Sequence, residues 1–63
     1  MTPQQINTIK KEYSILSTEC KKHYDKKDYE LLSITRIRLS TFIETIEKIF
    51  DIDFHNDKNL NTL

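Results

Sequence analysis

Cys20 and His23 are the two side chains best suited to bind a transition metal, and they stand three residues apart. On a helix this spacing places both on one face, and two copies of the chain would together offer the Cys2His2 set of a structural zinc site. Cysteine is also among the residue types most often buried, and Cys20 falls on an apolar stripe. We therefore expect a packed thiol beside a histidine near a helix C-terminus, and predict no metal site.

A second set of candidate ligands alternates near the C-terminus, in the manner of a calcium-binding loop: Asp51, Asp53, His55, Asp57 and Asn59. A calcium loop needs Gly at its sixth position and Glu at its twelfth, where this chain has Asn56 and Thr62. The segment is therefore interpreted as a solvated acidic stretch, and no cofactor is predicted.

A third pattern is a basic stripe that could follow a phosphate backbone. It repeats every eleven residues, about three helical turns, and has hydroxyl side chains between its charges: Lys10, Lys11, Lys21 and Lys22, with Ser14, Ser17 and Thr18. The stripe has no aromatic residue between its charges, and the formal net charge of the chain is zero. A solvated helix face is the first interpretation, and nucleic-acid binding is the alternative.

Catalysis has little support in the sequence. No Ser or Cys nucleophile stands in a recognisable arrangement with a His and a third orienting group. The chain has no Gly for a phosphate-binding loop. We expect no enzymatic activity and no catalytic residue.

The first element that must position these side chains is a helix over about residues 3–23. Thr2, Pro3 and Gln5 form the start signal, a capping box with Pro at the first helical position. The apolar stripe that follows has spacings of 3, 4, 3, 4 and 3: Ile6, Ile9, Tyr13, Leu16, Cys20 and His23. This period predicts an amphipathic helix.

The second element is a more apolar helix over about residues 28–50, with Asp28 as its N-cap. The same spacing recurs in Leu32, Thr35, Leu39, Phe42, Ile46 and Ile49, and the flanking residues Leu31, Ile43 and Phe50 widen the apolar arc. An arc of roughly 120° suits a helix that touches two neighbours.

Residues 24–28 are predicted to form the turn, because four of these five residues are charged and the apolar phase breaks there. One helix of about 48 residues is the alternative, since the turn has no Gly. Residues 1–54 are predicted as the helical hairpin, with Ile52 and Phe54 folded back over its end. Residues 55–63 are predicted as a flexible C-terminal tail.

The predicted fold is all-α: an antiparallel two-helix hairpin that dimerises into a four-helix bundle. Two helices shelter only one side of each other, and the single cysteine excludes an internal disulfide. The predicted dimer interface consists of Leu32, Leu39, Phe42, Ile43, Ile46, Ile49 and Phe50.

Three isoleucines fall off the apolar stripes and are candidates for a partner-binding surface: Ile15, Ile34 and Ile37. The expected function is non-catalytic binding of another protein, as a small regulator, adaptor or inhibitor that is itself a homodimer. A subunit that folds only on a larger helical partner is a further alternative. No membrane span or signal peptide is recognised, so we expect a cytoplasmic protein. Short proteins of this build are common in phage and plasmid genomes, and size and shape alone suggest such an origin.

Overall fold

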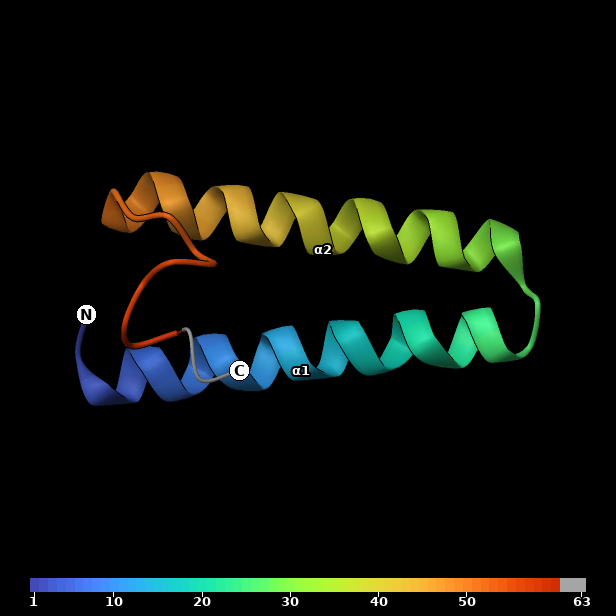
Figure 1. Ribbon diagram of the computed structural model, residues 1–63, viewed down its shortest axis with the longest axis horizontal. Coiled ribbons are helices and arrows are strands. Elements are labelled where there is room, and N and C mark those ends of the chain that lie inside the picture. Colours follow the sequence, from blue (N-terminus) through green and yellow to red (C-terminus); the bar gives the residue numbers. More distant parts are fainter. Residues whose placement is uncertain (61–63) are drawn as a thin grey trace.

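The computed structural model describes residues 1–60 of the chain, and within them it contains two helices and no strand. Helix α1 (Pro3–Asp25) and helix α2 (Tyr29–Phe50) lie side by side and antiparallel (Figure 1). The all-α hairpin is thereby confirmed and the single long helix is excluded. Helix α1 ends two residues later than predicted, at Asp25. Neither helix in this part of the chain has a stretch long and apolar enough to cross a membrane.

Helix α1 begins with the predicted capping box. The Thr2 hydroxyl accepts the backbone N–H of Gln5 at 3.1 Å, and the Gln5 side-chain oxygen accepts the backbone N–H of Thr2 at 2.9 Å. Pro3 follows at the first helical position, where its missing N–H costs no hydrogen bond. These contacts satisfy two donors that the helix start would otherwise leave unpaired.

The turn lies at residues 26–28 and reverses the chain without glycine. Lys27 takes a left-handed conformation with φ of 58°. The backbone N–H of Lys27 donates to the Tyr24 carbonyl, and that of Asp28 donates to the His23 carbonyl, which is the pattern of a Schellman motif. The Asp28 carboxylate then accepts the N–H of Leu31 at 3.2 Å and caps α2, as predicted.

Glu47 organises the second reversal of the chain, where α2 ends. Its carbonyl accepts the backbone N–H groups of Asp51 and Ile52, and its carboxylate accepts the N–H of Phe54 at 3.0 Å. Asp51 adopts a left-handed conformation with φ of 52° between them. The chain therefore turns back from α2 and crosses toward the first turns of α1 (Figure 1).

Residues 51–60, which we call the C-terminal segment, complete the core at the open end of the hairpin. Phe54 is 2% exposed and Leu60 is 1% exposed, and both pack with Ile9 of α1. The Phe54 ring lies 5.3 Å from that of Tyr13 and 6.4 Å from that of Phe42, measured between centroids. The fold-back predicted for Ile52 and Phe54 is confirmed, since Ile52 also packs against this cluster.

Residues 55–63 were predicted as a flexible tail, whereas Leu60 packs in the cluster with Ile9 and Phe54; residues 61–63 lie outside the described residues. Two aspartates shape this stretch as successive turns. The Asp53 carboxylate accepts the N–H of His55 and the Asp57 carboxylate accepts the N–H of Asn59. Such side-chain to backbone bonds order a polar stretch locally, so few apolar residues are needed to hold it.

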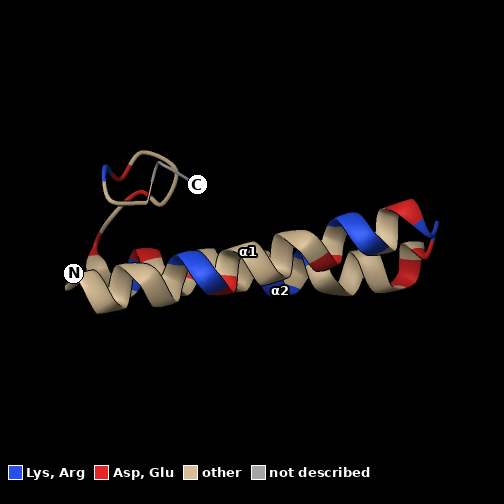
Figure 2. Cartoon of the chain, turned by 90° about the horizontal axis from the view of Figure 1, so that it is seen from below, with Lys and Arg blue, Asp and Glu red and all other residues tan. Residues whose placement is uncertain are grey.

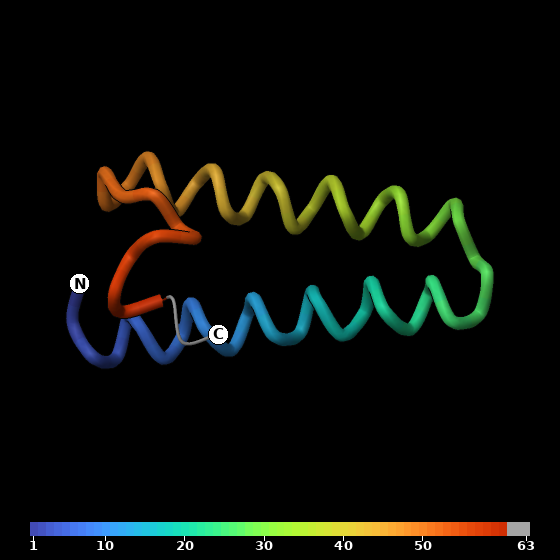
Figure 3. The backbone as a smooth tube through the Cα atoms, in the orientation of Figure 1, coloured from blue at the N-terminus to red at the C-terminus, as the bar shows by residue number. Residues whose placement is uncertain are grey.

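The C-terminal segment lies on one side of the two-helix layer (Figure 2), at the same end of the hairpin as the N-terminus (Figure 3). It covers part of α2 on that side, around Ile43 and Glu47. Within residues 1–60, no other segment of the chain covers the opposite side of the hairpin.

Candidate functional site

A row of large apolar side chains remains exposed along α2. The exposed fractions are 44% for Leu31, 47% for Ile34, 66% for Ile37 and 65% for Ile49. Leu31, Ile34 and Ile37 follow one another at spacings of three residues, so each adjoins the next on the helix surface. Ile49 comes 18 residues after Leu31, about five full turns, and so lies on the same line along the helix. Ile37 lies about 120° round the helix from Leu31 and borders this line. We call these four residues the α2 stripe.

Two of the three isoleucines predicted as a partner surface belong to the α2 stripe. The third, Ile15, is exposed on α1 and stands apart from it. Leu31 was expected to flank the buried seam, yet nearly half of its side chain is open to solvent.

The residues predicted for the dimer interface have different surroundings. Leu32 is buried by the chain itself, and Leu39 is half-buried. Four pack against the cluster that contains Phe54 and Leu60: Phe42, Ile43, Ile46 and Phe50. Ile49 alone of the seven is largely exposed. The C-terminal segment thus occupies much of the apolar arc that we had expected a second hairpin to shelter.

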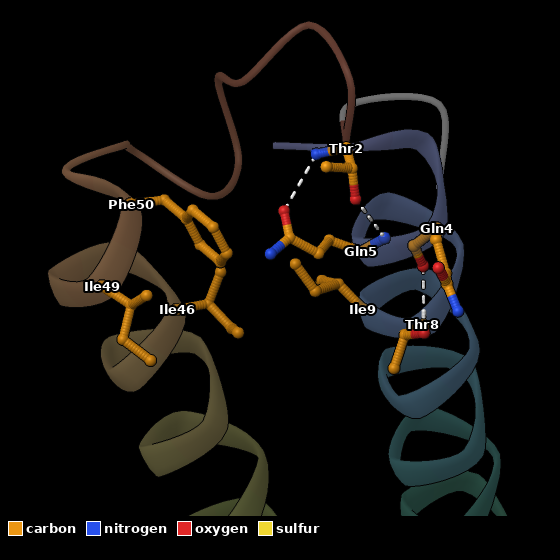
Figure 4. Close-up of a pocket in the computed structure, with 8 residues that line it drawn as sticks. All are labelled: Thr2, Gln4, Gln5, Thr8, Ile9, Ile46, Ile49 and Phe50. Carbon is orange, nitrogen blue, oxygen red and sulfur yellow. Dashed lines mark hydrogen bonds between the residues drawn. The ribbon is translucent and has the colours of Figure 1, made fainter.

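A groove of about 520 Å³ lies at the open end of the hairpin, between the start of α1 and the end of α2. Ile9, Ile46, Ile49 and Phe50 form its apolar lining, and Thr2, Gln4, Gln5 and Thr8 line the α1 side (Figure 4). The Thr8 hydroxyl donates to the Gln4 carbonyl at 3.0 Å, and Thr2 and Gln5 are bonded to each other in the capping box. Several polar groups of the α1 side are thus paired and the α2 side is apolar, so the groove is suited to an apolar side chain.

The basic stripe predicted on α1 forms two bands of Lys along that helix (Figure 2). Lys11, Lys21 and Lys22 are exposed, whereas Lys10 is half-buried. A shallow hollow of about 310 Å³ is lined by Tyr13, Ser14, Ser17, Thr18 and Lys21. The sequence pattern showed no aromatic residue within the stripe, but the fold brings the Tyr13 side chain to this hollow.

The candidate metal ligands do not gather into a site. Within residues 1–60, no three His, Cys, Asp or Glu side chains are placed to hold a metal ion together. Cys20 is a half-buried free thiol. Asp53 and Asp57 of the calcium-like pattern instead accept backbone N–H groups and shape the C-terminal segment.

No protein-family model, curated protein or solved structure matches this chain.

Proposed function

We propose that this chain is a small non-catalytic protein-binding module, a regulator, adaptor or inhibitor that acts as a homodimer. The α2 stripe is the observation that carries this proposal. Burying a Leu or Ile side chain that is otherwise exposed contributes about 1.5–3 kcal/mol, so a partner that covers the stripe gains substantial free energy.

The arrangement of the α2 stripe supports a protein partner. Leu31, Ile34 and Ile37 stand at successive spacings of three residues, and apolar anchors one turn apart are what a helix presents when it packs into the groove of another protein. The α2 helix is fully formed from Tyr29 to Phe50 and is capped by Asp28. Binding through a preformed helix avoids most of the ordering cost of a segment that folds on its partner. This favours a preorganised binder over the alternative of folding only on a partner.

Substitution of the stripe should separate protein binding from other functions. We expect Ile34→Asp and Ile37→Asp each to reduce capture of the host partner at least about tenfold, because a buried carboxylate would lose its hydration. The measurement is affinity capture from extracts of the native host on immobilised protein, with mass spectrometry of the bound proteins.

Thr18→Asp on α1 is the matched control, since it adds the same charge at an exposed position away from the stripe. Circular dichroism would verify that all three variants keep their helices. Equal capture by the stripe variants and the wild type would contradict the proposal.

The second candidate function is nucleic-acid binding by α1. The hollow that combines Lys21 with hydroxyl groups favours it, because Lys and hydroxyl groups both contact phosphate, although the Tyr13 ring beside them packs against Phe54. Neutral net charge counts against it, since no overall field attracts a polyanion.

Salt dependence distinguishes this second function. If α1 binds RNA, the logarithm of the binding constant should fall linearly with the logarithm of the salt concentration. The slope of this line should become smaller in the variants Lys11→Glu, Lys21→Glu and Lys22→Glu. Fluorescence anisotropy with a labelled RNA at several salt concentrations would measure this slope. Binding that is absent, or unaffected by these three changes, would exclude the α1 interface.

A further inference from the structure

We propose that the α2 stripe pairs with the α2 stripe of a second copy of this chain, with the two helices antiparallel. Leu31 of one copy then lies against Ile49 of the other, about a twofold axis near residue 40. This inference rests on the proposed protein-binding function and names the partner of that surface, so the protein that the stripe captures is a second copy of this chain.

The spacing of the stripe makes it complementary to itself. Leu31 and Ile49 are 18 residues apart, about five turns, so both face the same direction and are separated by about 27 Å along the helix. An antiparallel twofold contact requires that residue i meets residue j while j meets i. When the twofold axis passes midway between residues 31 and 49, Leu31 of each copy contacts Ile49 of the other copy.

A charged pair repeats the same register one residue earlier. Glu30 and Lys48 are also 18 residues apart, and both are exposed. In the antiparallel arrangement each Glu30 carboxylate lies opposite the Lys48 ammonium of the second copy. In a parallel arrangement with the same residues aligned, Glu30 would face Glu30 and Lys48 would face Lys48. Charge complementarity therefore selects the antiparallel orientation.

The middle of this contact can be buried at little cost. Ile34 lies between the ends of the stripe, and the Thr45 hydroxyl already donates to the Thr41 carbonyl at 2.8 Å. The Thr45 methyl group is therefore free to face an apolar neighbour without leaving a polar atom unpaired. Arg38 follows Leu31 by seven residues and lies on the same line, so the two Arg38 side chains lie on either side of the twofold axis. Their aliphatic stems can pack while the two guanidinium groups extend in opposite directions to the rim.

The groove at the open end lies where the second copy's Leu31 would dock. Ile49 forms part of its wall, together with Ile46 and Phe50. A leucine side chain placed against Ile49 would adjoin this apolar lining and would gain more burial than on a flat helix surface.

The charge distribution along the hairpin favours the same orientation. Residues 19–38, near the turn, contain six Lys or Arg and four Asp or Glu, a net charge of +2. The whole chain is neutral, so the remaining residues carry −2. Two copies side by side and antiparallel bring the positive end of each to the negative end of the other. No net repulsion opposes their association.

Sedimentation equilibrium of the full chain at about 1–200 μM would test the pairing. We expect a dimer for the wild type, and a dissociation constant raised at least about a hundredfold for Ile49→Asp, because two carboxylates would be buried per dimer. Glu30→Lys and Lys48→Glu should each weaken the dimer about tenfold, since two attractive pairs become repulsive. Circular dichroism would verify folding in every case.

Compensating changes make the test specific. The double variant Glu30→Lys/Lys48→Glu should recover the wild-type constant, and an equal mixture of the two single variants should form a heterodimer. Lys11→Glu, which makes the same charge change on α1, should have no comparable effect. A wild-type monomer at 200 μM, or a dimer indifferent to Ile49→Asp and to the charge reversals, would overturn the inference.

The failure of this inference is distinguishable from that of the proposed function. A monomer whose capture of another host protein is abolished by Ile34→Asp would overturn self-pairing and leave protein binding standing. A monomer whose capture is insensitive to Ile34→Asp and Ile37→Asp would overturn both.

Discussion

Phe54→Ala is expected to lower the free energy of unfolding by about 3–5 kcal/mol, the usual cost of removing a buried phenylalanine. Phe54 is 2% exposed and packs against Ile9, with the rings of Tyr13 and Phe42 close by. Few other side chains of this small protein are as completely enclosed, so its removal leaves a cavity between α1, α2 and the C-terminal segment. Urea denaturation followed by circular dichroism at 222 nm would measure the loss.

A loss of this size approaches the entire stability of a domain of this length, so the variant should be compared with the wild type in a stabilising osmolyte. His55→Ala is the matched control. His55 is exposed and makes only an edge contact with the Phe54 ring, at 5.6 Å between centroids, so its truncation should lower stability by about 1 kcal/mol or less. Equal stability of Phe54→Ala and His55→Ala would contradict the core described here.

Leu60→Ala is the second substitution with a large expected effect, a loss of about 2–4 kcal/mol. Leu60 is 1% exposed in the same cluster as Ile9 and Phe54, although it stands in an Asn-rich stretch. Its backbone N–H donates to the Asp57 carbonyl at 3.1 Å, which closes the last turn of the C-terminal segment. The same urea titration would measure the effect.

The neighbouring exposed residue provides the comparison for Leu60. Lys58→Ala should leave the urea midpoint unchanged within error, because Lys58 is exposed. If residues 55–60 were a flexible tail, neither Leu60→Ala nor Lys58→Ala would change stability. An unchanged urea midpoint for Leu60→Ala would therefore contradict the packing of Leu60 in the core. A loss of stability without a change in helix content at zero urea would show that the segment adds to a hairpin that is already formed.

The C-terminal segment also determines which surface of α2 is available to a partner. Phe42, Ile43, Ile46 and Phe50 pack against its cluster, whereas Leu31, Ile34, Ile37 and Ile49 remain exposed. Binding through the α2 stripe therefore leaves the C-terminal segment in place. A partner that required Ile43 would first have to displace Phe54.

The two helices and the residues that cap their starts could be predicted from the sequence alone. Thr2, Pro3 and Gln5 satisfy the first donors of α1 through contacts three residues apart, and Asp28 does the same for α2. The apolar period of each helix identifies the side that must be buried. Interactions this local depend on neighbours in the chain, so the sequence pattern is enough to recognise them.

The position of the C-terminal segment was decided by tertiary structure. Nothing in the composition of residues 55–60 marks Leu60 as buried, because the surface that covers it comes from Ile9, some fifty residues earlier. The same packing divides the apolar surface of α2 into two parts. Phe54 covers one part, and the α2 stripe remains exposed to solvent. The apolar period of a helix indicates which of its side chains need to be covered, but only the folded chain determines which other side chains cover them.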